Sequence, residues 1–413
     1  MKRYYFLALI FWFLLPLETS ASPPLNLHGV RNLGMGQVGA GLMVDASTIY
    51  FNPGAAAFLD RNQLMIGSTL VLPHTEFLGQ FPSLYRAEMD LPSQTPSYFY
   101  ALFRLGKQGI WQKLRWGVAV NSPFLTNTRW PDDWAGNQLS QEFSLTFFTI
   151  QPTLSWRISP KVSIGLGAVL GSGSMLIRKA LPENGPDESA ANLQYNGSGN
   201  LLGFNAGIAF QPNDQLRIGL SYRSALNMRI DSGEARYTVP LSLSQLYPDG
   251  NFQTEIPLPA SLQAGLSYKA NERVMVVGEW GYQTWASWDS LRLQFAQQTQ
   301  QVQDTSIARA YRNTWNLRLG AEFEVNEWVQ LRIGAFYELT PVPEDFLSPE
   351  QPDANRIGLS AGLGLRLLKG LGLDLGYLYE YAGERSSLYR PAAFGGTYLS
   401  YRFHFGGGIR YQF

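Results

Sequence analysis

The last sixteen residues of this 413-residue chain alternate between two kinds of side chain. Leucine, isoleucine and aromatic residues occupy one face as far as Phe413, whereas Arg402, His404 and Arg410 lie on the other. A period of two belongs to a β-strand and excludes a helix. One face is too apolar for water and the other is too charged for the dry core of a sandwich, but a wall between lipid and a polar lumen suits both. We therefore predict a transmembrane β-barrel.

The only long apolar run lies at the N-terminus, at residues 4–17. It follows Lys2 and Arg3 and precedes a stretch of small residues, so we predict a signal peptide over residues 1–21, cleaved near Ala21 or Ser22. No later stretch approaches the roughly 18 apolar residues that a spanning helix needs. The mature chain is expected to be exported without a helical anchor.

Charge and cysteine content exclude several classes of function. The 32 basic and 32 acidic residues balance, which leaves no electrostatic basis for a nucleic-acid partner. There is no cysteine, so neither disulfides nor thiolate metal sites can form.

Period-two segments separated by turns occur fourteen times, an even number as bacterial single-chain barrels require. We predict strands near residues 62–74, 96–105, 113–124, 143–157, 161–179, 199–211, 215–233, 257–270, 272–296, 309–325, 327–340, 356–368, 370–383 and 397–413. In the fourth strand the apolar residues change phase after Phe147, and we predict a bulge near Phe147 and Phe148. Short turns alternate with long segments, which is typical of periplasmic turns and extracellular loops. The long segments are at 75–95, 125–142, 180–198, 234–256, 297–308, 341–355 and 384–396.

Residues 22–61 precede the first strand and are rich in small residues and turns. A barrel of about 14 strands leaves a lumen that must be plugged unless it is an open channel. The predicted fold is therefore all-β: a 14-stranded antiparallel transmembrane β-barrel over residues 62–413, plugged by an N-terminal hatch over residues 22–61.

Several motifs resemble one family in the same order along the chain. In the hatch they are Val30–Gly34, Asp45–Thr48 and the pair Asn52–Pro53, and later motifs lie at 131–134, 217–224, 258–261, 341–343 and 353–356. Together they are similar to the FadL/TodX family of outer-membrane long-chain fatty acid and hydrocarbon transporters. The similarity covers essentially the whole mature chain.

This resemblance implies a hydrophobic capture groove among the loops, an interior pocket for an amphipathic ligand, and lateral exit into the outer membrane beside a kink in the third strand. The kink here would involve Asn121, Ser122 and Pro123, and proline suits a disrupted ladder, although Pro123 could equally just end the strand. The Asn-Pro-Ala hatch motif of the family appears as Asn52, Pro53 and Gly54, where glycine is expected to loosen the backbone.

Two groups of residues are candidates for ligand contact. A lumen-facing arginine can hold a fatty acid carboxylate, but the same arginines could pair with the acidic residues of the lumen. The arginines are Arg157, Arg217, Arg318, Arg332 and Arg366, and the acids are Glu279, Glu322, Glu338, Asp374 and Glu380. The apolar hatch residues either line the pocket or only pack the plug; they are Leu42, Ile49, Phe51 and Phe58.

Other chemistry finds little support. Gly34–Gly39 formally matches the dinucleotide fingerprint but follows no strand and opens no helix. His28, His74 and His404 are scattered, so we expect no metal, no cofactor and no enzyme.

The expected function is passive uptake of a hydrophobic small molecule across the outer membrane by a multi-pass protein, with outer-membrane lipid as its surroundings. Because segment 180–198 is short for a capture platform, a small rigid hydrophobe is as suitable as a fatty acid. A non-selective porin and a structural or adhesin barrel are the alternatives.

Overall fold

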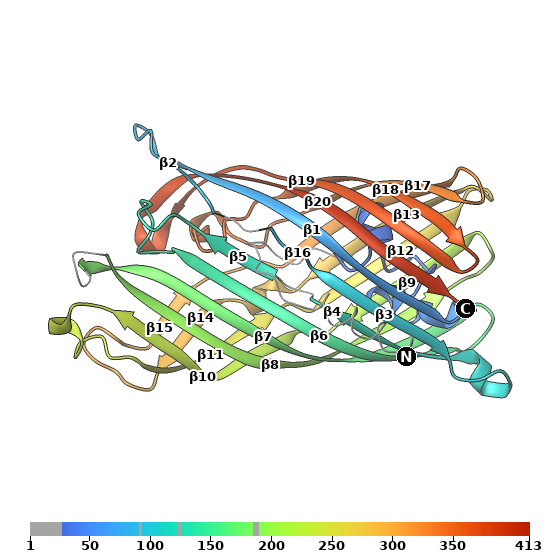
Figure 1. Cartoon of the computed structure of the whole chain (residues 1–413), viewed down its shortest axis with the longest axis horizontal. Coiled ribbons are helices and arrows are strands. Elements are labelled where there is room, and N and C mark those ends of the chain that lie inside the picture. Colours follow the sequence, from blue (N-terminus) through green and yellow to red (C-terminus); the bar gives the residue numbers. More distant parts are fainter. Residues whose placement is uncertain (1–26, 91–92, 123–124, 185–189) are drawn as a thin grey trace, which may run out of the picture.

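Fourteen antiparallel strands form the wall of a closed barrel in the computed structural model, which describes residues 27–90, 93–122, 125–184 and 190–413 (Figure 1). Four of these strands carry two labels each, because they are divided by a break in their regular hydrogen bonding. In chain order the wall consists of β1 (Gln63–Gly79), β3 (Ser97–Arg104), β4 (Leu114–Asn121) with β5 (Leu125–Arg129), β6 (Glu142–Arg157), β7 (Val162–Asn184), β8 (Ala190–Phe210), β9 (Leu216–Arg223) with β10 (Leu226–Thr238), β11 (Gly250–Leu258) with β12 (Ser261–Lys269), β13 (Val274–Gln283) with β14 (Ser290–Phe295), β16 (Thr314–Glu324), β17 (Val329–Glu338), β18 (Arg356–Leu368), β19 (Leu371–Tyr389) and β20 (Phe394–Gln412). The short strands β2 (Arg86–Glu88) and β15 (Thr305–Ala308) belong to the connections.

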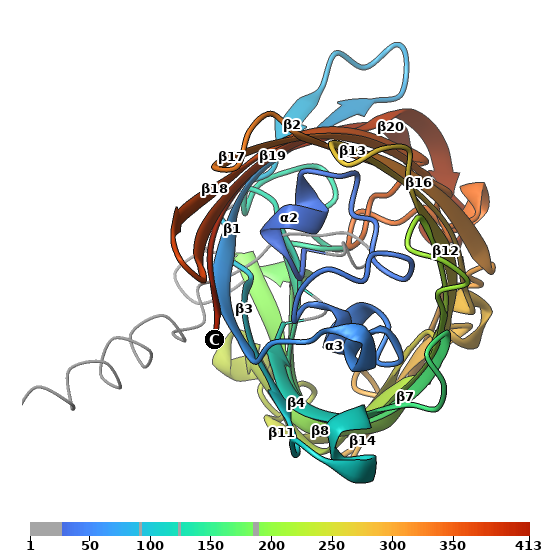
Figure 2. The same ribbon diagram turned by 90° about the vertical axis from the view of Figure 1, so that its right-hand side faces the viewer.

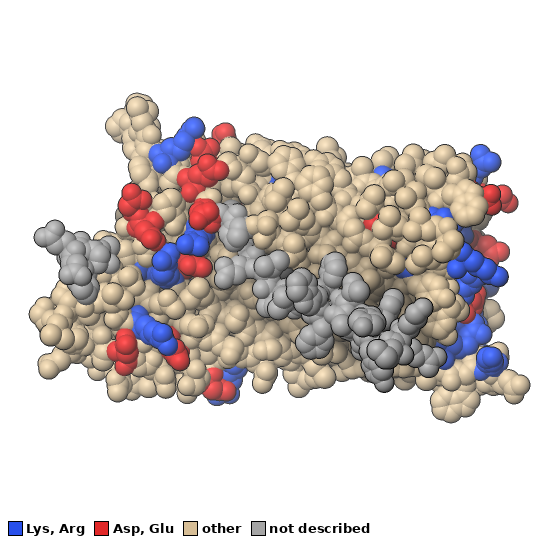
Figure 3. All heavy atoms as spheres, viewed as in Figure 1, with Lys and Arg blue, Asp and Glu red and all other residues tan. Residues whose placement is uncertain are grey.

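The first and last strands close the barrel. β1 pairs with β20 from Gln63 opposite Gln412 to Gly79 opposite Gly396. On β20 the predicted alternation is confirmed, because Phe405 and Ile409 are exposed while Arg402 and His404 are buried inside. In Figure 3 a band nearly free of charge lies between two charged ends. We call these the long-loop end, which carries β2 and β15 (left in Figure 1), and the short-turn end, where the chain finishes.

All fourteen predicted strands are present, but several are longer than predicted. β7 and β8 stay paired to Ala180 opposite Asn192, and their backbones pair again at Asn184 and Ala190, so most of the predicted loop at 180–198 is strand. The ladders at 234–256 and 384–396 also intrude into predicted loops. Ladder hydrogen bonds continue outside lipid, where both faces of a strand can be polar. Loss of the apolar face therefore marked the membrane boundary and not the end of the strand.

The predicted bulge in the fourth strand is wrong. β6 alternates between buried and exposed residues without a slip from Phe143 to Trp156. The offset lies in the neighbouring strand: Asn121 of β4 is opposite Thr149, whereas Leu125 of β5 is opposite Thr146. What changes along β6 is the inner face, which is apolar from Phe143 to Phe147 and polar beyond.

The described part of the hatch, residues 27–61, lies inside the barrel (Figure 2). It contains α2 (Val30–Leu33), α3 (Thr48–Phe51) and the 3-10 turn η1 (Ala55–Phe58). Its backbone lies directly against wall glycines, including Gly54 on Gly207 of β8 and Gly34 on Gly362 of β18. No helix within the described residues has the length and apolar character needed to cross a membrane.

Candidate functional site

The hatch is fixed to the wall by buried charges. Arg31 forms ion pairs with Glu322 of β16 and, at 3.7 Å, with Asp45 of the hatch itself. Glu279 of β13 accepts hydrogen bonds from the backbone nitrogens of Gly39 (2.7 Å) and Ala40 (2.6 Å). Because a buried carboxylate is costly without partners, these contacts hold the hatch in one position.

The lumen arginines form an ion-pair network. Arg318 lies 3.5 Å from Glu279 and 3.3 Å from Glu338. Arg332 lies 2.7 Å from Glu322 and 2.6 Å from Asp374. Both guanidinium groups are almost completely buried. Of the two predicted roles for these arginines, the structure therefore shows ion pairing with the acidic residues of the lumen.

The other three arginines lie toward the short-turn end. Arg157 is half-buried at the end of β6. Arg217 donates to the carbonyl of Met43 at 3.0 Å, and Arg366 pairs with Glu324 at 2.6 Å. None of the three lines the apolar cavity described below.

The hatch apolar residues pack within the plug and against the wall. Ile49 and Leu42 belong to two separate buried clusters, Phe51 lies against the backbone of Gly39, and Phe58 packs beside Met43 and Ala55. None of these four candidates lines the apolar cavity.

Asn52, Pro53 and Gly54 dock onto β6, β7 and β8. Asn52 donates to the carbonyl of Ile208 at 3.1 Å, Ser155 donates to the carbonyl of Pro53, and Ser163 donates to the carbonyl of Gly54 at 2.7 Å. Gly54 has ordinary helical torsions, φ −62° and ψ −36°. Any residue can adopt these torsions, so the contribution of glycine seen here is its missing side chain, which permits close approach to the wall.

A methyl group at position 54 is expected to lower the thermal stability of the barrel. A Cβ on Gly54 would lie 2.6 Å from the carbonyl oxygen of Gly207, a backbone atom that cannot rotate away. We expect Gly54→Ala to cost about 1–3 kcal/mol, as overpacking typically does. The measurement is thermal unfolding in detergent, with Gly407→Ala as the control, because a Cβ there meets nothing within 4 Å. Equal melting temperatures for the two variants would disprove tight docking.

The ladder on the third strand is interrupted at the predicted kink. β4 pairs with β3 only as far as Asn121 opposite Tyr98, and among the described residues β5 forms a ladder with β6 alone. The other edge of β5 accepts a backbone hydrogen bond, from Asp90 to the carbonyl of Arg129 at 2.9 Å. Asn121 donates to the hydroxyl of Tyr100 at 3.1 Å, and Tyr100 donates to the carbonyl of His28 in the hatch at 2.7 Å. Ser122 is half-buried directly before the interruption, and Pro123 lies outside the described residues. The end of the ladder is thus hydrogen-bonded to the hatch.

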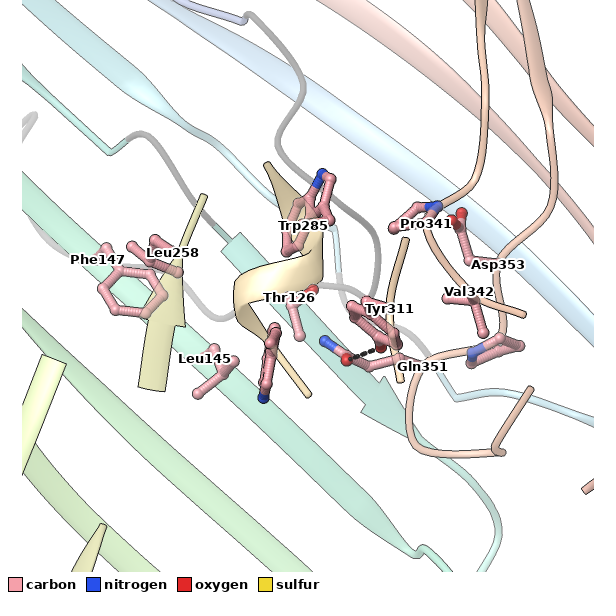
Figure 4. Close-up of a pocket in the computed structure, with 12 residues that line it drawn as sticks. Thr126, Leu145, Phe147, Leu258, Trp285, Tyr311, Pro341, Val342, Gln351 and Asp353 are labelled. Atoms are coloured by element: carbon pink, nitrogen blue, oxygen red, sulfur yellow. Dashed lines mark hydrogen bonds between the residues drawn. The ribbon is translucent and has the colours of Figure 1, made fainter. Parts of the chain in front are cut away.

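An apolar cavity lies in the long-loop half of the lumen, next to this interruption (Figure 4). Leu145 and Phe147 of β6 form one side, and Thr126 of β5 also lines it. Leu258 at the end of β11 also contributes. The remaining side chains come from the segments between β13 and β16 and between β17 and β18; they include Trp285, Trp288, Tyr311, Val342 and Gln351. The apparent change of phase in β6 was the sequence signal of this cavity. The inward-facing residues of β6 are apolar only from Phe143 to Phe147, where the strand lines the cavity.

Two cations share one carboxylate beside the cavity. Glu350 forms ion pairs with Arg309 and, at 2.6 Å, with Lys179 of β7. Burial alone would raise the pKa of Glu350, but the two cations outweigh it and hold that pKa at about 2. The Arg309 guanidinium also lies 5.9 Å from the ring of Trp288, which lines the cavity. No sequence motif marked these three residues.

Comparison with known proteins agrees with this geometry. Residues 18–398 match the family described as outer membrane protein transport protein (OMPP1/FadL/TodX). The long-chain fatty acid transport protein of Escherichia coli O6:H1 is 24% identical over 95% of both chains. That of Salmonella typhi is 23% identical over 88% of both.

Solved structures share the fold. A Pseudomonas aeruginosa FadL homologue has a TM-score of 0.82 at 17% identity, covering 96% of this chain and all of that one. The toluene transporter TodX of P. putida has a TM-score of 0.72 at 15% identity, covering 94% of this chain and 99% of that one. Given the extent of the family match, this outer-membrane β-barrel belongs to the OMPP1/FadL/TodX family, whose members are not enzymes but transporters of hydrophobic compounds.

Proposed function

We propose that the protein takes up long-chain fatty acids passively and releases them sideways into the outer membrane. The observation that carries the substrate class is the pair of cations, Lys179 and Arg309, sharing Glu350 beside the apolar cavity. This grouping has one positive charge more than it has negative, which a ligand carboxylate would balance. Asp353, which also lines the cavity, is held by the hydroxyl of Thr340.

Hydrophobic transfer would drive entry. The cavity has room for about one water, ≈ 20 Å³, so an acyl chain would enter only as the lining side chains move apart. Each methylene that then leaves water would contribute about 0.8 kcal/mol, and no energy source would be needed. Differential affinity for two hatch positions is the only means by which binding could couple to opening.

The lateral route rests on what surrounds the cavity. Toward the periplasmic, short-turn end the lumen holds the hatch, with Arg31 and Glu279 tying it to the wall. Sideways, the cavity adjoins β5, whose ladder to β3 is missing among the described residues. A ligand at Thr126 and Leu145 is therefore nearer to an interrupted wall than to an open axial path.

A monoaromatic hydrocarbon is the second candidate. Trp285, Trp288 and Tyr311 give the cavity an aromatic lining that suits a flat ring, and a relative of known structure is a toluene transporter. Such a ligand would make no use of the cations.

Removing a positive charge at Lys179 and removing the negative charge at Glu350 are expected to change the affinity for fatty acid in opposite directions. Lys179→Met removes the surplus charge and should weaken oleate binding about tenfold or more, the size of one charge-assisted contact. Glu350→Gln removes the competing carboxylate and should tighten it. Binding is measured by displacement of a fluorescent fatty acid from purified protein, with Lys161→Met on the exposed short-turn rim as the control.

Toluene binding serves as the second arm of this experiment. Unchanged toluene affinity in both variants is expected if the charges act on the carboxylate. The fatty acid proposal fails if oleate and toluene shift in parallel, or if both variants shift oleate affinity in the same direction.

A further inference from the structure

A second cavity opens at the short-turn end of the barrel, remote from the apolar one. Arg61 at the end of the hatch, Arg366 of β18, Lys369 in the turn before β19, and Arg410 of β20 contribute to its lining. Glu327 is the only acidic residue in that lining. Arg366 and Arg410 are paired with carboxylates just outside the lining, so Arg61 and Lys369 supply the positive charge that favours an anion.

Two of these cations, Arg366 and Arg410, are held in place by carboxylates, whereas Arg61 and Lys369 are not. Arg366 pairs with Glu324 at 2.6 Å and donates to the carbonyl of Glu327 at 3.0 Å. Arg410 lies 3.2 Å from Asp374 and donates to Gln330 at 3.1 Å. Arg61 and Lys369 are exposed, and neither forms an ion pair with any side chain in the described part of the chain.

The cavity also has an apolar side. Trp328 and Leu368 belong to its lining and are 55% and 68% exposed. Trp328 directly precedes β17 and Leu368 is the last residue of β18, so both lie at the short-turn end of the barrel. Tryptophan at this level is typical of the membrane interface. A soluble anion would use only the charges, whereas a lipid would also use the apolar side.

We propose that this cavity binds the phosphate of one anionic phospholipid from the periplasmic leaflet of the outer membrane. The phosphate would lie between Arg61, whose guanidinium can pair with it through two hydrogen bonds, and the ammonium group of Lys369, with Arg410 contributing charge from the same lining. The acyl chains would lie against Trp328 and Leu368. This site is independent of fatty acid uptake, because its lining shares no residue with that of the apolar cavity.

The test compares two double variants that remove the same charge from the same rim. Arg61→Gln with Lys369→Gln removes two cations of the cavity. Lys161→Gln with Arg273→Gln removes two exposed cations from other short turns and is the control. Binding of phosphatidylglycerol to the purified full-length protein is followed by native mass spectrometry, with phosphatidylcholine and inorganic phosphate as comparison ligands.

One phosphatidylglycerol is expected to remain on the wild type and the control, and the cavity variant should bind it about tenfold more weakly or worse, as loss of charge-assisted contacts implies. Unchanged binding in the cavity variant, or an equal loss in the control, would overturn the site. Displacement of the lipid by inorganic phosphate at similar concentration would overturn the lipid as its ligand and leave a soluble oxyanion in its place. Thermal unfolding of both variants shows whether either has lost its fold.

Discussion

Leu145→Trp is expected to abolish uptake of the hydrophobic ligand. Leu145 is buried on the inner face of β6 and lines the apolar cavity beside the interrupted third strand. An indole in its place would occupy the space that the ligand needs, at an overpacking cost of about 1–3 kcal/mol that a barrel can tolerate. Uptake of radiolabelled oleate into cells that lack their own transporter is the measurement.

The matched control lies on the same strand and faces lipid. Ile150 is 42% exposed, so Ile150→Trp adds the same bulk outside the barrel. We expect that variant to transport like the wild type. Normal uptake by Leu145→Trp, with the protein present in the outer membrane, would show that the ligand takes another path.

Loss of one hatch arginine is expected to make the barrel leak ions. Arg31→Met removes the partner that Asp45 and Glu322 share. Breaking a buried ion pair typically costs about 3–5 kcal/mol, enough to favour a displaced hatch. Planar bilayers should record conductance steps in this variant above a nearly silent wild type.

A rim arginine provides the comparison. Arg366 at the short-turn end is ion-paired with Glu324 of β16 and donates to the carbonyl of Glu327, and Arg366→Met should stay silent because exposed pairs contribute at most about 1 kcal/mol. Steady conductance by the wild type would instead favour the porin alternative, since a porin needs no movement of residues 27–61.

Alternation along single strands made the fold predictable. In each spanning strand, apolar residues that face lipid alternate with residues that face the lumen, as Phe405 and His404 do. Strand ends were less predictable. The ladder of β7 and β8 continues beyond the membrane, where one face of a strand no longer needs to be apolar and the alternation ends.

The site was much less predictable because its residues meet only after closure. Lys179, Arg309 and Glu350 come from three distant segments, and no local spacing relates them. Arg318 and Arg332 occupy lumen-facing positions of alternating strands, and a ligand-binding arginine would have the same pattern in the sequence. Their acidic partners on neighbouring strands, Glu279 and Glu322, could be identified only once the strand register was known, and they place both arginines in the ion-pair network.

The seam between β1 and β20 has a consequence for assembly. Its partners, such as Gln63 and Gln412, lie at opposite ends of the barrel-forming sequence, so this ladder has the largest loop-closure entropy of the wall. Residues 27–61 lead directly into β1 and are already enclosed when the seam is complete. Closing this ladder therefore also encloses the plug, and a chain whose residues 27–61 had not folded into place would close around an unfilled pore.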